Sequence, residues 1–159
     1  MQRQLVFIPI HNDELDAITG ATTLTRRQAH TVTSELLEAL EYTDAQTEDA
    51  EYAAMVIASV AALAAHGERL VLVAEVPASQ VSPGTDAANG EVVVADVPPE
   101  SITCWFSEAE GVDFADAAAA ASGLDVDTAW DFPQVQELLH ANDMLWNGVE
   151  EFRRGVQDV

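Results

Sequence analysis

The sequence predicts one α+β domain with a mixed, largely antiparallel sheet of four to five strands, covered by a buried central helix and a long C-terminal amphipathic helix. Valine-rich runs that stop at prolines indicate strands, because proline cannot donate to a sheet ladder. A long uncharged segment indicates the buried helix, and apolar residues at helical spacing near the end indicate the amphipathic one. With 159 residues, the whole chain, 1–159, is expected to form a single domain.

The predicted strands follow short apolar runs in chain order. Leu5–Ile10 is the first, apolar throughout and therefore expected to be buried on both faces. Gln28–Val32 is a weaker, fifth strand. Leu70–Val76 and Glu91–Val97 are marked by an internal echo, since both carry Val-Ala-acid-Val followed by proline. Ile102–Phe106 is the last predicted strand, so the sheet is assembled from both halves of the chain.

The echo also predicts which side chains the two strands share. Alternation should turn equivalent residues to the core, namely Leu72, Ala74 and Val76 in one copy and Val93, Ala95 and Val97 in the other. Glu75 and Asp96 also occupy equivalent places, but as a carboxylate pair they would meet only if the strands were parallel.

Two helices are predicted to cover the sheet. Glu48–Ala65 has acidic residues only in its first turn, which suits the helix dipole, and Gly67 is placed to end it. Pro133–Arg154 begins with a proline, carries apolar residues at helical spacing, and ends in arginines, which the dipole favours there.

Charge excludes several kinds of function. The chain has no lysine, six arginines and 28 acidic residues, for a net charge of −22. Schiff-base and phosphate-loop lysine chemistry are therefore excluded, and we expect no direct binding to nucleic acid. Cys104 is the single cysteine, so no disulfide or cysteine metal cluster is expected, and no motif calls for a cofactor. The apolar runs are too short for a signal segment or a membrane span, so a cytoplasmic protein is expected.

Three polar residues after the first strand form the candidate catalytic site. His11, Asp13 and Glu14 follow the strand at its carboxyl end, where α/β proteins commonly place polar function. A histidine beside carboxylates can act as a general base or help to hold a metal. The alternative is structural: Asn12 caps a short helix over 13–18, with acids in its first turn.

The last predicted helix holds candidate metal ligands. Glu137, His140 and Asp143 lie one turn apart, so one helix face could hold a metal, or the three side chains could simply be solvated. The segment 125–131 begins like a calcium loop, but Trp130 stands where that loop needs glycine. We interpret this segment as an acidic loop.

Several segments together resemble a family of small, acidic, uncharacterised actinobacterial proteins, a domain of unknown function. They are Leu5–Pro9, Glu51-Tyr52-Ala53-Ala54, the paired proline-ended strands, Met144-Leu145-Trp146 and Glu150-Glu151. This resemblance implies a cytoplasmic single domain and no activity.

The proline-ended strands are also similar, more weakly, to those of ADP-ribosyltransferase-like and other NAD-cleaving domains. That similarity would give site roles to Arg69, His30 and Glu108.

These observations predict a non-enzymatic interaction or regulatory module that presents an acidic surface to a basic protein partner. Charge steering would make such binding fast and sensitive to salt. The alternative is a small enzyme or nucleotide-binding domain, hydrolytic or NAD-cleaving, with its site near His11.

Overall fold

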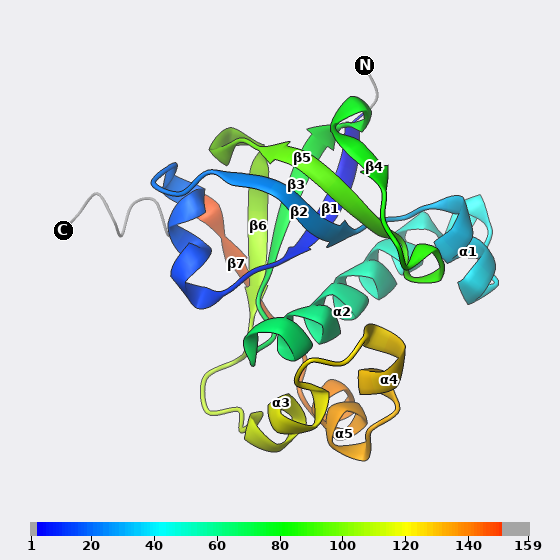
Figure 1. Ribbon diagram of the computed structural model, residues 1–159, viewed down its shortest axis with the longest axis vertical. Coiled ribbons are helices and arrows are strands. Elements are labelled where there is room, and N and C mark those ends of the chain that lie inside the picture. Colours follow the sequence, from blue (N-terminus) through cyan, green and yellow to red (C-terminus); the bar gives the residue numbers. More distant parts are fainter. Residues whose placement is uncertain (1–2, 151–159) are drawn as a thin grey trace.

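The strands of this protein form one antiparallel sheet. The computed structural model describes residues 3–150. Its seven strands are arranged in the order β4-β5-β2-β1-β3-β6-β7, and every neighbouring pair is antiparallel. They are β1 (Arg3–Pro9), β2 (Leu24–His30), β3 (Val71–Pro77), β4 (Val81–Pro83), β5 (Glu91–Val97), β6 (Ile102–Ser107) and β7 (Leu145–Gly148) (Figure 1). The predicted mixed sheet of four to five strands is therefore wrong in both pairing and strand number.

Helices connect these strands and cover part of the sheet. The α-helices are α1 (Ser34–Leu40), α2 (Thr47–His66), α3 (Ala115–Ala121), α4 (Val126–Trp130) and α5 (Pro133–Ala141). Short 3-10 helices are η1 (Asn12–Thr19), η2 (Asp44–Gln46), η3 (Ala78–Gln80), η4 (Ala87–Asn89) and η5 (Pro99–Ser101). Among the helices of residues 3–150, none combines the length and the apolar character that crossing a membrane requires.

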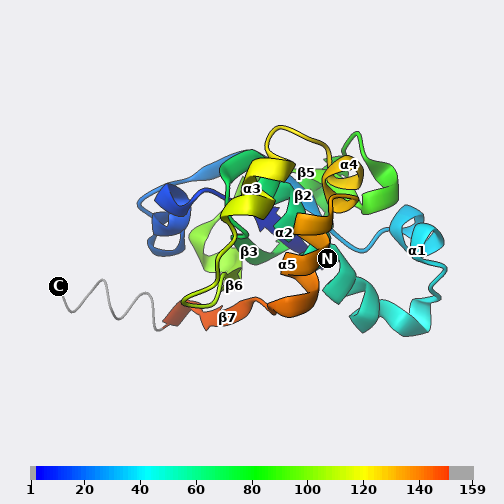
Figure 2. The ribbon, with the colours of Figure 1, turned by 90° about the horizontal axis from the view of Figure 1, so that it is seen from below.

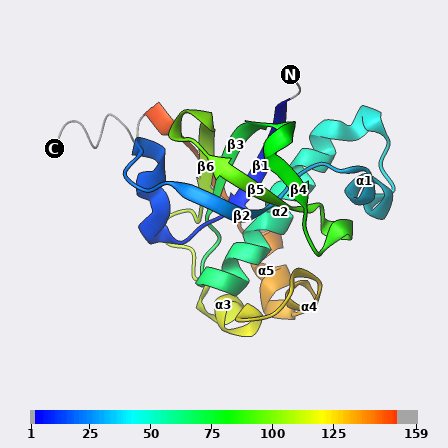
Figure 3. The same cartoon turned by 45° about the horizontal axis from the view of Figure 1, so that its top comes forward.

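The sheet folds over itself at the junction of β1 and β2. These two strands pair only at Phe7 and His30, whereas β1 pairs with β3 along its whole length. Figures 1 and 3 show β2, β5 and β4 crossing in front of β1, β3 and β6. The space between the two halves is filled by a core of fully buried side chains, including Val6, Leu72 and Val94. Burial of these apolar side chains stabilises the folded sheet.

A second core lies between the sheet and the helices. Phe7 and Val73 turn outward from the first core and pack against α2, whose Ala58 and Leu63 are buried. Figures 1 and 2 show α3, α4 and α5 gathered on the far side of α2. Because α2 has neighbours on both sides, it needs few charges after its first turn, as the sequence predicts.

The strands and the central helix that the sequence predicts from clear patterns are present in the structure. The strands expected at Leu5–Ile10, Leu70–Val76, Glu91–Val97 and Ile102–Phe106 are β1, β3, β5 and β6, to within two residues. The buried central helix is α2, ended at Gly67 in the left-handed conformation. The weaker strand expected at 28–32 is β2, which begins earlier.

The prediction of one long C-terminal helix over Pro133–Arg154 is wrong. α5 ends at Ala141, Asn142 is extended, and Leu145–Gly148 pairs with β6 as β7. Residues 151–154 of the prediction lie outside the described residues. The apolar run before Asn147 fits a strand as well as a helix, and the pairing of Trp146 with Phe106 on the neighbouring strand decides between them.

The echo does not produce equivalent faces. In β5 the buried residues are Val92, Val94 and Val97, whereas Ala95 is exposed. Alternation is interrupted opposite Arg26, whose φ is 50°. The two echoed strands are separated in the sheet by β1 and β2, so the carboxylates of the echo do not pair.

Candidate functional site

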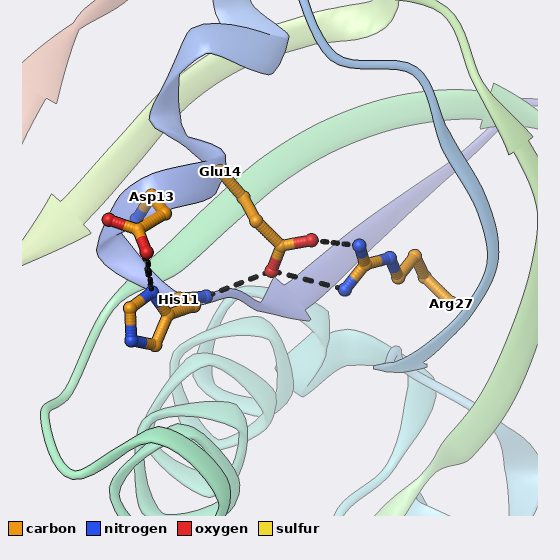
Figure 4. Close-up of polar contacts among 4 residues, drawn as sticks. All are labelled: His11, Asp13, Glu14 and Arg27. Atoms are coloured by element: carbon orange, nitrogen blue, oxygen red, sulfur yellow. Dashed lines mark hydrogen bonds and ion pairs between the residues drawn. The ribbon is translucent and has the colours of Figure 1, made fainter.

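His11 caps the first 3-10 helix, η1. Its Nδ1 accepts a hydrogen bond from the Asp13 backbone N–H at 3.1 Å. Glu14 Oε1 accepts one from the His11 N–H at 3.1 Å (Figure 4). The cap of η1 is therefore His11, and the expected cap, Asn12, is instead its first residue. This reciprocal arrangement satisfies backbone donors that a helix start otherwise leaves free.

Glu14 joins this helix to the sheet. Its carboxylate forms an ion pair with the guanidinium of Arg27 on β2 (Figure 4). Burial acts to raise the pKa of Glu14, but the hydrogen bond from the His11 backbone and the Arg27 charge outweigh it, so the pKa is lowered. A carboxylate held ionised in this way is suited to anchoring, and it is a weak base.

The structure adds a second histidine that the sequence did not suggest. The rings of His11 and His66 meet edge to face, with centroids 5.7 Å apart. Partial burial lowers the pKa of His66, the last residue of α2. His11 itself remains 47% exposed, and its Nδ1 lies 3.4 Å from Asp13 Oδ2. His11, Asp13 and Glu14 are thus adjacent, with Asp13 almost fully in solvent.

The candidate metal ligands are not brought together on one helix. Glu137 and His140 are exposed on α5, while Asp143 lies beyond its end at Ala141. Within residues 3–150, no group of three or more His, Cys, Asp or Glu side chains is arranged to hold a metal ion. The prediction that 125–131 is an acidic loop is wrong: most of the segment is helix α4, and Asp125 caps it by accepting from the Thr128 N–H at 2.8 Å.

Two of the three residues suggested by the NAD-cleaving similarity form a buried ion pair. Arg69 donates to both carboxylate oxygens of Glu108, and also to the Asn142 carbonyl at 3.0 Å. His30, the third residue, lies on β2 beside Asn89. The arginine and the glutamate thus satisfy each other, and their contacts join the segment before β3 to the segments after β6 and before β7.

A cavity of about 500 Å³ lies where α2, the β2–β5 pair and the α3–α4 connection meet; we call it the His30 cavity. Sequence reasoning did not find it. Its apolar lining is Pro9, Ala61, Ala64, Ala65, Leu124 and Val126, and its other lining residues are Gln28, His30, Thr85, Asp86, Glu91, Gly123, Asp125 and Asp127. Four carboxylates and no arginine are in that lining, so the cavity favours a positive charge.

His30 is the one buried polar side chain in the lining, only 3% exposed. Its Nδ1 lies 2.9 Å from the Asn89 carbonyl oxygen. Because a carbonyl only accepts, Nδ1 carries the proton and Nε2 of the neutral ring is a free acceptor. Burial lowers the pKa of His30 and keeps the ring neutral, although the Asn89 contact and the Glu91 and Asp86 charges oppose this.

The carboxylates around the cavity are held in place. Glu91 Oε2 accepts from the Thr85 N–H and hydroxyl, at 2.6 and 2.8 Å, and from the Asp86 N–H at 2.9 Å. These bonds outweigh the effect of burial and lower the pKa of Glu91. Asn89 donates to both Asp86 and Asp127, which ties the β4–β5 connection to α4. The negative charge is therefore preorganised.

One sequence pattern, the alternation of polar and apolar residues on β2, could have pointed to this cavity. Gln28 and His30 alternate on β2 with Ala29, which faces the first core, so two polar side chains share the opposite face. Apart from Pro9, the other walls come from segments more than thirty residues away in the chain, which no local pattern can bring together.

Comparison with known proteins gives a family but no activity. A family model described as a family of unknown function (DUF6912) matches residues 4–154. No curated protein and no solved structure matches the chain.

Proposed function

Because this chain belongs to DUF6912, a family of unknown function, its role has to be inferred from geometry, and we propose that it is a non-enzymatic module that binds a basic cytoplasmic protein. In this proposal the His30 cavity receives a lysine or arginine side chain of the partner. The observation that carries it is a cavity lined by four carboxylates, an alanine wall and no arginine. The net charge of −22 supports the same class of partner.

The shape of the lining suits a long cationic side chain. Ala61, Ala64 and Ala65 line one wall on α2, and small apolar side chains leave room for an aliphatic stem. Asp125 and Asp127 stand on the opposite segment, where they would meet the charged head. A volume of about 500 Å³ is within the range of binding pockets.

His30 supplies a specific contact for that head. Its neutral Nε2 can accept one N–H of a guanidinium or ammonium group while Nδ1 stays on the Asn89 carbonyl. Protonation of the ring would replace an acceptor with a second positive charge. Because burial lowers the pKa of His30, binding should weaken only once the pH falls below that lowered pKa, which lies under about 6.5, the ordinary value for histidine.

The test is a titration with a hexa-arginine peptide at low salt. We expect the double variant D125N/D127N to bind about tenfold more weakly, since a contact of about 1.4 kcal/mol corresponds to that factor. Asparagine preserves the cap of α4 and leaves an acceptor toward Asn89, so the fold should be retained.

The matched control is E35Q/E38Q, which removes the same charge from exposed residues of α1, outside the cavity lining. We expect a less than twofold effect on binding. If both double variants weaken binding equally, the charge acts as a diffuse shell and the cavity proposal is wrong. Pull-down from the protein's own cytoplasm at low salt then serves to identify the partner.

A second candidate function is a small enzyme or nucleotide-binding domain with its site near His11. The observation that favours it is the contact of His66 with His11 beside the Glu14–Arg27 pair. Its test is nicotinamide release from NAD, with H11N as the inactive variant because asparagine also caps helices. Turnover that persists in H11N, or no turnover in the wild-type protein, argues against this function.

A further inference from the structure

We propose a second docking site, a groove between the N-terminal half of α2, Phe106 on β6 and the segment that leads into β7, which receives an apolar side chain from a basic segment of another protein. We call it the Tyr52 groove. Its volume is about 420 Å³, and its lining includes Tyr52, Met55, Phe106 and Met144, with Glu51 and Asp143 as its charged members. It does not depend on the His30 cavity, which lies at the other end of α2.

An exposed aromatic residue lies on the same face of the sheet as Phe106, which lines the groove. Trp146 pairs with Phe106 across β6 and β7, so both side chains lie on one face of the sheet. Trp146 is 61% exposed and Tyr52 is 60% exposed, which makes them the most exposed large apolar side chains among the described residues. Aromatic residues are enriched at the centres of protein interfaces, so two large exposed aromatic side chains, one of them lining a groove, favour an interaction site.

The groove can adapt to a partner side chain. Met55 on α2 and Met144 before β7 line it, and methionine is unbranched and repacks at little cost. β7 is the last strand of the sheet within residues 3–150, so its outer edge has no strand partner there. A bound segment can therefore approach both the groove and the strand edge.

Charge identifies the occupant as a basic segment. Glu51 and Asp143 are the only charged residues of the lining, and both are acidic. A second copy of the chain would bring another net charge of −22 against them, which disfavours self-association. A leucine or aromatic residue flanked by arginine or lysine satisfies both the apolar wall and the carboxylates.

The methionines give a direct readout. The chain has three, and two of them, Met55 and Met144, line the groove. We would label the methionine methyl groups with carbon-13, assign them with M55L and M144L, and titrate a short peptide in which leucine alternates with arginine. We expect saturable shifts of the Met55 and Met144 methyl resonances.

Peptide and protein controls separate the possible outcomes. An arginine–serine peptide should leave the two methyl resonances nearly unmoved, and so should a glutamate–leucine peptide. Y52S should weaken binding about tenfold, because truncating a central aromatic contact typically costs more than 1 kcal/mol. L145S, on the opposite face of β7, should change it less than twofold.

Equal shifts with the arginine–serine peptide, or equal losses in Y52S and L145S, overturn the proposal. In D125N/D127N, the leucine–arginine peptide should shift the Met55 and Met144 methyl resonances as much as it does in the wild-type protein. Failure at the Tyr52 groove is thereby distinguished from failure at the His30 cavity.

Discussion

Arg69 and Glu108 form a bidentate ion pair in the interior of the protein, with N–O distances of 2.5 and 3.0 Å and side chains that are 3% and 7% exposed. The arginine also donates to the carbonyl of Asn142, in the segment that leads into β7. This pair therefore helps to hold β7 beside β6, where the sequence alone predicts a helix.

Breaking this pair should destabilise the protein strongly. E108Q leaves the Arg69 charge buried without its counter-ion, and such losses typically cost about 3–5 kcal/mol. We expect the double variant R69M/E108L to be less destabilised than E108Q, because no charge then remains buried. Urea denaturation of the three proteins measures this, and a loss below about 1 kcal/mol in E108Q would contradict the role assigned to the pair.

Gly90 is expected to be irreplaceable for a steric reason. Its φ is +69°, and an added Cβ would lie 2.3 Å from the Thr31 carbonyl oxygen. Gly67 has a similar φ of +83° but has open space around it, so G67A isolates the cost of the backbone conformation, about 1–2 kcal/mol. G90A should cost roughly 1–3 kcal/mol more than G67A. Thermal unfolding of both variants provides the comparison, and equal costs would show that the loop moves freely.

His30 should make the stability of the protein depend on pH. Its pKa is lowered in the folded state, so the unfolded chain takes up the proton first as the pH falls below about 6.5. The wild-type protein should then lose stability relative to H30Q, progressively down to the lowered pKa, whereas above pH 7 the difference should be constant. Denaturation of both proteins from pH 8 to pH 5 isolates this histidine, because His66 is present in each. A difference that does not change with pH would contradict the buried neutral ring.

His11 should contribute to stability as a helix cap. H11A removes the acceptor for the Asp13 N–H and should cost about 1 kcal/mol. H11N should restore most of that loss, since asparagine is a preferred cap. Chemical denaturation of the two variants tests this, and equal stability of H11A and the wild-type protein would exclude a capping role.

Local sequence pattern was enough to predict the strands and the helix whose stability depends on one dominant physical property, such as extended backbone preference or burial. Val71–Pro77 is a strand because a run of valines favours extended backbone and proline ends the ladder. α2 was recognisable because a segment without charges past its first turn can be stable only when it is buried. The burial of β5 was less predictable, since Arg26 on its neighbour breaks the alternation and no pattern in β5 reports this.

In the candidate site, too, some contacts follow from the sequence and others depend on the tertiary structure. Asp13 and Glu14 lie near His11 because they are close in the sequence, but the contact with His66 depends on where α2 ends in space. The sequence did not predict the His30 cavity, because its acidic residues come from the β4–β5 connection, the start of β5 and the start of α4. These acidic residues lie more than fifty residues after β2 in the chain.

The sequence by itself determined the α+β class, the buried central helix, the proline-ended strands and the acidic character of the surface. These follow from composition and from periodicities of two and about four residues, which act within one element. Only the tertiary structure decided that Leu145–Gly148 is a strand, that Arg69 meets Glu108, and that His30 faces an acidic cavity. Each of these depends on a partner far away in the chain, and local preference yields to such contacts where the two compete.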